Sequence, residues 1–196
     1  MSTVVVVRRN GTACIAADSL TTFGEQKQSP VYDRYSDKVQ PIGDGALSIV
    51  GSAAHALVIE SVLGGDRVDF DLRDRLSIFE SFRALHAELK EHYFLNPKDD
   101  DGDSDPYESS RIDALIAHPH GIFGVYALRE VYEYRRFWAI GSGADYALGA
   151  MYAVYDQHED AEAIARIGVA AGAEFDAGSS MPWTCRSFAL AGDSEN

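Results

Sequence analysis

The start of the chain most strongly constrains the fold, because its pattern is typical of a β-hairpin. Residues 4–7 are four consecutive valines, a β-branched run that favours a buried strand. Asn10-Gly11 follows, the dipeptide that most favours a two-residue hairpin turn, and residues 14–17 return as the partner strand. We therefore expect an antiparallel pair whose first strand begins almost at Met1.

The rest of the sequence alternates between short apolar strands and helical patterns. Further strands are expected at residues 46–50, 114–117, 122–126, 136–140 and 183–189. The three between residues 114 and 140 are expected to form a second antiparallel set. Helices are expected at residues 53–63, 74–94, 143–155 and 160–172, and a polar connection at 24–36. Two sheets covered by two helix layers satisfy this order, which indicates the α+β class.

Side-chain patterns refine the helix predictions. Ser52 is the expected N-cap of the first helix. Residues 143–155 are apolar nearly all round, so this helix is expected to be buried. The second helix carries apolar side chains at helical spacing, which predicts one buried face formed by Leu76, Phe79, Phe82, Leu85 and Leu89.

Length and charge limit the possible classes of protein. The chain has 196 residues and no Pro/Gly/Ser-rich linker, which predicts a single domain over residues 1–196. Its net charge of −14 disfavours nucleic acid and anionic membranes as partners. The valine run is too short for a signal peptide or a membrane span, and Cys14 and Cys185 are expected to be buried thiols in a reducing compartment. These features predict a cytoplasmic protein.

No metal or cofactor site is predicted. The acidic run at residues 99–105 fits neither register of an EF-hand loop, so we expect a solvated loop. His118 and His120 flank a proline and are expected to point apart, with no third zinc ligand in sight. Gly141-Ser142-Gly143 lacks the third glycine of a dinucleotide-binding fingerprint.

Ser2 is the candidate nucleophile. After removal of Met1 it would carry a hydroxyl and a free α-amine on one residue. Because the reference pKa of an α-amine is about 7.7–8.0, the amine can accept the hydroxyl proton near neutral pH. Many chains begin Met-Ser, and the alternative is an ordinary frayed terminus.

The surroundings favour the catalytic interpretation. The hairpin turn lets Asp18 approach the start of the first strand, and Lys38 is a cation able to pair with that carboxylate. Gly51 ends an apolar strand before a helix, so its backbone N–H can point at a developing oxyanion. Ser142 lies at another helix start.

Several short segments occur in a characteristic order along the chain between Ser2 and about Phe188. They are Ser2-Thr3-Val4-Val5-Val6-Val7-Arg8-Arg9-Asn10-Gly11, Ile15-Ala16-Ala17-Asp18, Asp37-Lys38-Val39, Val50-Gly51-Ser52-Ala53-Ala54 and Ala139-Ile140-Gly141-Ser142-Gly143. Together they resemble the bacterial proteasome-type β subunits of the N-terminal nucleophile hydrolases, above all HslV and the betaproteobacterial proteasome homologues. The resemblance implies a four-layer α-β-β-α sandwich of two antiparallel sheets.

The resemblance also implies roles for individual residues. Ser2 takes the nucleophile position, Asp18 the carboxylate position and Lys38 the position of the lysine that lowers the proton affinity of the nucleophile. The Gly51 amide takes the oxyanion-hole position. The supporting residues would be Ser142, Asp176 and Ser179. Two departures stand out: serine replaces the usual threonine, and the interval from Asp18 to Lys38 is longer than in HslV.

The implied function is a self-compartmentalising peptidase without a cofactor. Its subunits would form stacked rings of six or seven, admit unfolded polypeptides, and work with a possible ATP-dependent unfoldase. Two alternatives stay open: a catalytically silent ring that serves as a scaffold or binding chamber, and a small-molecule amidase. Residues near Gly51 and Asp18 are expected to bind the substrate side chain and to favour apolar ones, namely Thr21, Ile49 and Ala53.

Overall fold

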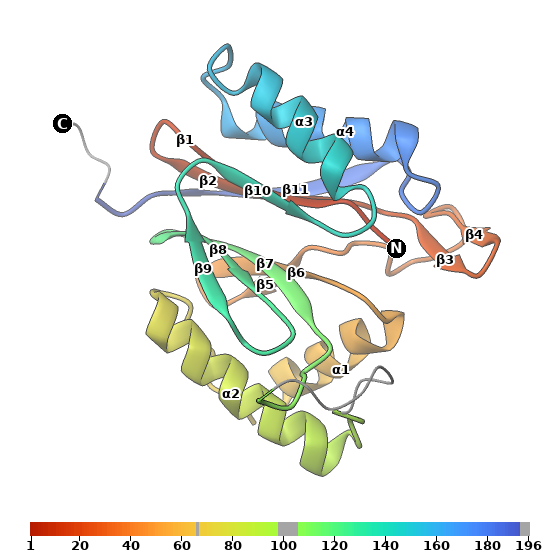
Figure 1. The fold of residues 1–196 in the computed structure, drawn as a ribbon, viewed down its shortest axis with the longest axis vertical. Coiled ribbons are helices and arrows are strands. Elements are labelled where there is room, and N and C mark those ends of the chain that lie inside the picture. The colour runs from red at the N-terminus through yellow and green to blue at the C-terminus, as the bar shows by residue number, and fades with distance from the viewer. Residues whose placement is uncertain (66, 98–105, 193–196) are drawn as a thin grey trace.

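Two antiparallel sheets lie face to face, and a pair of helices covers the outer face of each (Figure 1). This arrangement comes from a computed structural model, which describes residues 1–65, 67–97 and 106–192. The predicted α+β class and the four-layer α-β-β-α sandwich are confirmed. The expected acidic loop at 99–105 lies outside the described residues.

The first sheet has the strand order β10-β1-β2-β11. Its strands are β1 (Val4–Arg9), β2 (Thr12–Asp18), β10 (Phe137–Ile140) and β11 (Trp183–Ala189). The hairpin turn forms as predicted, with Asn10 and Gly11 at φ values of 45° and 70°. Val4 pairs with Ala17 on one side and with Ile140 on the other, so β1 is an interior strand that starts at residue 4.

The second sheet has the order β5-β6-β7-β8-β9. Its strands are β5 (Gln40–Ile42), β6 (Gly45–Val50), β7 (Asp113–His118), β8 (Gly121–Val125) and β9 (Val131–Tyr134). The assignment of residues 136–140 to this set is wrong, because β10 pairs with β1 in the first sheet. Arg135 and Arg136 form a short connection between the edge strands of the two sheets, and apolar residues alone do not specify which sheet a strand joins.

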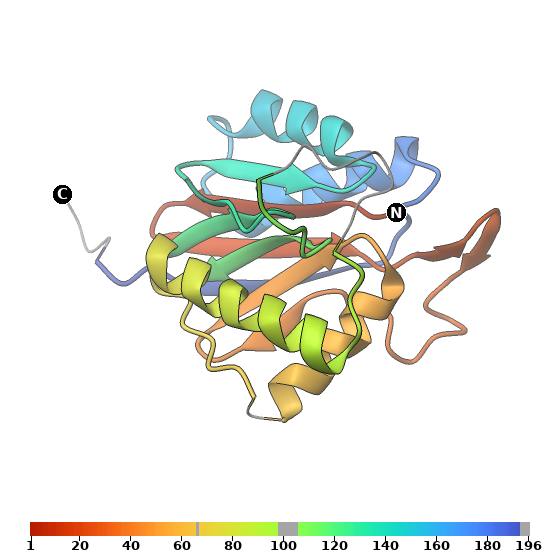
Figure 2. The same cartoon turned by 60° about the horizontal axis from the view of Figure 1, so that its bottom comes forward.

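Part of the predicted polar connection at 24–36 also forms strands. A separate hairpin consists of β3 (Thr21–Phe23) and β4 (Gln26–Gln28), with Gly24 in its turn at φ 58°. The hairpin projects from the body of the molecule (Figure 2). Its strands are too short and too polar to show an apolar alternation, so the sequence pattern missed them.

The four helices begin close to their predicted starts. They are α1 (Ala53–Gly64), α2 (Arg75–His92), α3 (Ala144–Val154) and α4 (Ala161–Phe175). Ser52 caps α1 as predicted, through a hydrogen bond from the Ala54 amide to its hydroxyl. Helices α1 and α2 cover the second sheet, and α3 and α4 cover the first (Figure 1). None of the helices in the described residues is long and apolar enough to cross a bilayer.

The apolar faces of two helices are only partly used for packing within the chain. In α2, Phe82, Leu85 and Leu89 are buried as predicted. The predicted burial of Leu76 and Phe79 is wrong, because both side chains are exposed. The predicted burial of the 143–155 helix is wrong, because α3 lies in an outer layer and buries only Ala147 and Met151. An apolar helix sequence favours burial, but it does not indicate which neighbouring surface covers the helix.

Three apolar cores separate the layers, and the valine run contributes to two of them. Val4 and Val6 lie in the core between the sheets, whereas Val5 and Val7 face α3 and α4. The third core lies between the second sheet and α1 and α2. Because successive strand residues point to opposite faces, one short strand anchors both sides of its sheet.

The cysteines and histidines of the described residues form no metal cluster. Cys14 is buried, and burial raises its pKa to about 12. Cys185 is only half-buried, which corrects the expectation of two buried thiols. The His118 and His120 rings are stacked with centroids 5.2 Å apart, so the prediction that they point apart is wrong.

The close approach of α4 to the N-terminal strand generates a prediction about stability. A Cβ added at Gly172 would lie 2.2 Å from Oγ1 of the buried Thr3, whereas one added at Gly149 in α3 meets no atom within 4 Å. We expect Gly172→Ala to lower the free energy of unfolding by about 1–3 kcal/mol through overpacking. Gly149→Ala should raise it by up to about 1 kcal/mol through helix propensity. Urea denaturation measures both, and equal effects would contradict the predicted close packing.

Candidate active site

Ser2 lies two residues before β1 and is held in place by backbone contacts. Only 7% of its surface is exposed. Its carbonyl accepts a hydrogen bond from the Gly143 amide at 3.2 Å, and the carbonyl of Thr3 accepts one from the Asp18 amide at 3.1 Å. The structure therefore excludes the frayed terminus that the sequence left open as an alternative.

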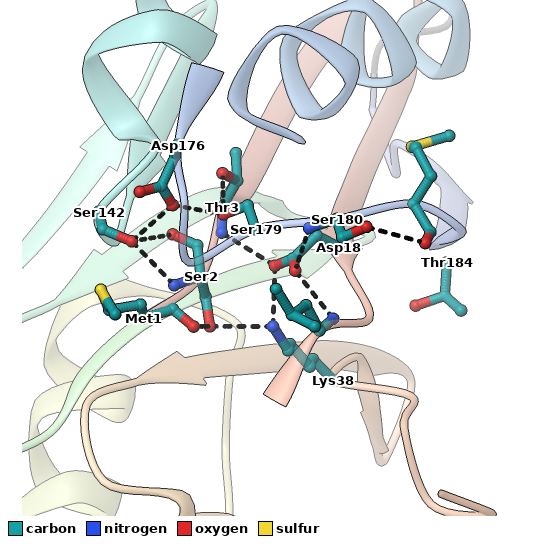
Figure 3. A network of polar contacts seen from close by, with 12 residues as sticks. Met1, Ser2, Thr3, Asp18, Lys38, Ser142, Asp176, Ser179, Ser180 and Thr184 are labelled. Carbon is teal, nitrogen blue, oxygen red and sulfur yellow. Dashed lines mark hydrogen bonds and ion pairs between the residues drawn. The ribbon is translucent and has the colours of Figure 1, made fainter. Parts of the chain in front are cut away.

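Lys38 lies between Ser2 and Asp18 (Figure 3). Its Nζ donates to the Ser2 Oγ at 3.1 Å and to Oδ1 of the fully buried Asp18 at 2.8 Å. Burial lowers the pKa of Lys38 from its ordinary value, against the opposing effect of the Asp18 carboxylate. The ammonium is the form that can stabilise negative charge on the Ser2 oxygen.

Asp37 fixes the backbone that carries Lys38. The Asp37 carboxylate accepts hydrogen bonds from the Thr184 hydroxyl and from the Val39 amide, both at 2.8 Å. Arg186 lies 3.8 Å from the same carboxylate and also donates to the Val39 carbonyl. Strand β11 therefore anchors the residues on both sides of Lys38, Asp37 before it and Val39 after it.

A second polar group lies on the nitrogen side of Ser2 (Figure 3). The Ser2 N–H donates to the Ser142 Oγ at 3.2 Å, and this hydroxyl donates to Oδ2 of Asp176 at 2.7 Å. Ser179 donates to the same carboxylate oxygen at 2.7 Å. Burial raises the pKa of Asp176, but these hydrogen bonds outweigh it and the net shift is downward. Asp176 thus remains an acceptor that orients Ser142 toward the nitrogen.

Met1 engages the hydroxyl of Ser2. The Ser2 Oγ donates to the Met1 carbonyl oxygen at 2.5 Å. While Met1 is present, the Ser2 nitrogen is an amide and cannot accept a proton near neutral pH. The arrangement around Ser2 therefore places a hydroxyl beside a cation, and removal of Met1 would turn the neighbouring amide nitrogen into a free amine.

Four predicted residues lie outside this hydrogen-bonded cluster. Gly51 is at the junction of β6 and α1, with a φ of 119°, and no hydrogen bond among the described residues links it to Ser2. Thr21 begins β3, and Ala53 begins α1. Ile49 is partly buried and packs against the core beneath α1 and α2.

The sequence analysis missed three residues that donate a backbone N–H to Asp18, namely Thr3, Leu20 and Ser180. The buried Thr3 donates its amide to Asp18 at 3.0 Å, and its hydroxyl lies 2.7 Å from that of Ser179. Ser180 contributes its backbone N–H to Asp18 at 3.1 Å. A polar residue directly before an apolar strand was a usable signal for Thr3. A backbone contact such as that of Ser180 leaves no side-chain signal in a sequence.

Comparison with solved structures shows the family. BPH from Thiobacillus denitrificans matches with a TM-score of 0.90 at 43% sequence identity, and the match covers 97% of this chain and 100% of that one. The chain belongs to the bacterial proteasome-type β-subunit family. BPH in complex with epoxomicin matches this β subunit with a TM-score of 0.88 at 43% identity, over 96% of this chain and 99% of that one.

A more distant match agrees in fold. Eukaryotic HslV from Trypanosoma brucei has a TM-score of 0.65 at 22% identity, over 94% of the β subunit and 98% of its own chain. At this identity the likeness concerns the fold alone. No protein-family model matches the sequence. The resemblance predicted from the short segments is confirmed, and the β subunit is of the N-terminal nucleophile peptidase type.

The buried ion pair at the site generates a second stability prediction. Asp18→Asn removes the charge opposite Lys38, and we expect it to lower the free energy of unfolding by about 3 kcal/mol because it leaves a largely buried cation uncompensated. The matched control is Asp156→Asn, which breaks the exposed pair with Arg136 and should shift the urea midpoint far less. Equal shifts for the two variants would contradict the importance of the buried pair.

Proposed function

We propose that the chain, once Met1 is removed, is a self-compartmentalising N-terminal nucleophile peptidase. The carrying observation is the position of the Ser2 oxygen, 3.1 Å from the Lys38 ammonium, on a residue whose own nitrogen is held by Ser142. Ser2 thus carries both the proposed nucleophile and the nitrogen that becomes the base, and the Lys38 cation lies beside it. A general base and a nearby positive charge are the two usual means of activating a hydroxyl.

The first step forms an acyl-ester. The α-amine of Ser2 takes the hydroxyl proton as the oxygen attacks the carbonyl carbon of the scissile amide. Lys38 stabilises the negative charge that develops on the attacking oxygen, and Asp18 holds Lys38 in place. The Gly51 N–H is proposed to bind the oxyanion of the tetrahedral intermediate. The C–N bond then breaks, and the leaving amine takes the proton from the α-ammonium.

The second step releases the acyl group. Water attacks the ester carbonyl, and the free α-amine of Ser2 accepts a proton from this water. The C–O bond to Ser2 breaks, the oxygen regains its proton, and a carboxylic acid leaves. Ser142, Asp176 and Ser179 act throughout as positioning residues, because they orient the nitrogen without contacting the substrate carbonyl.

We further propose that Thr21, Ile49 and Ala53 bind the substrate side chain before the scissile bond. None of the three is charged, so apolar substrate residues should be preferred to acidic or basic ones. A panel of fluorogenic peptides that differ only at this residue measures the preference as kcat/KM. Fastest cleavage after Arg or Glu would contradict the assignment.

The proposed assembly is a stacked pair of rings, each of six or seven subunits. Support comes from the 43% identity with BPH and from apolar side chains that the isolated chain leaves exposed. A closed chamber would admit only extended chains, so unfolded polypeptides are the proposed substrates and an ATP-dependent unfoldase is a possible partner. Native mass spectrometry tests the ring, and a monomer at micromolar concentration would contradict it.

Removal of Met1 is the central test of the mechanism. We expect processed protein to hydrolyse peptides and to bind epoxomicin, the ligand of the related BPH structure. Met1-retaining protein should be at least about 10³-fold slower, because its Ser2 nitrogen is an amide. Ser2→Ala on processed protein should be as slow, and Ser2→Thr should keep or raise the rate by restricting the hydroxyl rotamer.

The matched control is Ser61→Ala, which removes a hydroxyl from the exposed face of α1. It should leave the rate of processed protein unchanged. Native mass spectrometry with epoxomicin reads binding independently of turnover. If Met1-retaining protein or Ser2→Ala turns over like processed protein, Ser2 is not the nucleophile. If processed protein assembles but neither hydrolyses peptides nor binds epoxomicin, the chain is a silent ring.

The pH dependence of processed protein should be bell-shaped. The rising limb follows the α-amine, which accepts a proton only when deprotonated and has a reference pKa of about 8. The falling limb follows Lys38, which acts only when protonated. Burial lowers the pKa of Lys38 from its ordinary value of 10.5. As the pH is raised, kcat/KM should therefore begin to fall before pH 10.5 is reached. A profile that stays flat up to that pH would contradict this role of Lys38.

A further inference from the structure

An apolar groove lies beside the first turns of α2, away from Ser2. It has a volume of about 580 Å³, and its apolar side chains include Leu76, Phe79, Tyr107 and Val131. The Leu76 side chain, placed by the sequence pattern on the buried face of its helix, is 77% exposed here. We call this hollow the α2 groove. It is an apolar surface that nothing within the described chain covers.

Charged side chains of both signs line the α2 groove. Arg75 and Arg129 are held in place by hydrogen bonds to backbone carbonyls, Arg75 to Val131 and Arg129 to Glu108. Glu130 also lines the groove. An occupant would therefore need apolar side chains together with one acidic and one basic group.

A segment with these properties occurs in the same chain. Residues 29–36, which we call the docking segment, connect β4 to the short stretch before β5 that carries Lys38. Val31, Tyr32 and Tyr35 in this segment are 86%, 83% and 79% exposed, and none of them belongs to the three cores. Asp33 and Arg34 lie between the aromatic residues. The segment matches the groove in apolar character and in both charges.

The two surfaces lie on opposite sides of the molecule. In Figure 2 the β3–β4 hairpin and the orange chain that follows it are at one end, and the yellow start of α2 is at the other. The segment of one chain therefore cannot fill its own groove. Contacts between two different surfaces of identical chains are heterologous, and such contacts form a ring when the rotation from one copy to the next closes.

We propose that the docking segment of one subunit inserts into the α2 groove of a second copy of this chain. Tyr32 and Tyr35 pack against Leu76 and Phe79, Asp33 faces the two arginines, and Arg34 faces Glu130. A specific interface buries roughly 800 Å² on each partner, so this contact is the centre of a larger surface. The inference rests on the proposed function, because it names the surface that builds the proposed ring.

The first test separates the two surfaces. The segment variant carries Tyr32→Ser and Tyr35→Ser, and the groove variant carries Leu76→Ser and Phe79→Ser. We expect each to self-associate at least about thirtyfold more weakly, as for interface hot spots, and to appear as a 21.4 kDa monomer in native mass spectrometry. Tyr152→Ser removes an exposed aromatic ring from α3 and should still form rings. Assembly of both double variants like the unchanged protein would overturn the proposal.

The second test mixes the two variants. Each retains the surface that the other lacks, so a pair has one intact contact and should form a 1:1 dimer that cannot grow into a ring. Formation of this dimer also shows that both variants are folded. A mixture that stays monomeric overturns the proposal, and so does one that forms complete rings.

The masses keep the docking separate from the proposed function. If unchanged rings neither hydrolyse peptides nor bind epoxomicin, the proposed function fails, while native mass spectrometry of the variants still shows whether the segment docks in the groove.

Discussion

The buried carboxylate of Asp18 is the interaction on which the site depends. A fully buried charge needs compensation, and Asp18 obtains it from the Lys38 ammonium and from the backbone amides of Thr3, Leu20 and Ser180. These donors come from segments far apart in the chain, so one carboxylate joins them. The same contacts that satisfy the charge place a cation beside the Ser2 oxygen. The contacts that compensate the buried charge of Asp18 therefore also assemble the candidate site.

The location of β1 holds Ser2 in place although this residue lies next to the chain terminus. Chain termini usually fray, yet β1 lies between β2 and β10, and its valines enter the cores on both faces of the sheet. Ser2 therefore inherits the rigidity of an interior strand. Glycines at the surrounding turns and in α4 allow this close packing, since a Cβ at Gly172 would collide with Thr3. Because the Ser2 nitrogen is an amide while Met1 is attached, Met1 has to leave before this nitrogen can accept a proton.

Much of the site was predictable, but by two routes of different kind. Ser2 followed from its chemistry, whereas the roles of Lys38, Ser142 and Asp176 followed from the resemblance to a family. The structure brings these residues together by contacts that no local pattern encodes: Ser2 and Ser142 are separated by 140 positions. The backbone donor at Ser180 left no trace in the sequence, because a backbone amide is the same at almost every residue.

By itself the sequence determined the N-terminal hairpin, the α+β class and the cap of α1. Each of these depends on neighbours along the chain, such as the turn geometry of Asn10-Gly11 or the hydroxyl of Ser52. Only the tertiary structure decided that β10 joins the first sheet, that α3 stays at the surface and that Leu76 lies open to solvent. An apolar side chain in the sequence indicates that its burial would stabilise the fold. It does not indicate which surface buries it. That choice is made by the packing of distant elements and, in our proposal for Leu76, by a second copy of the chain.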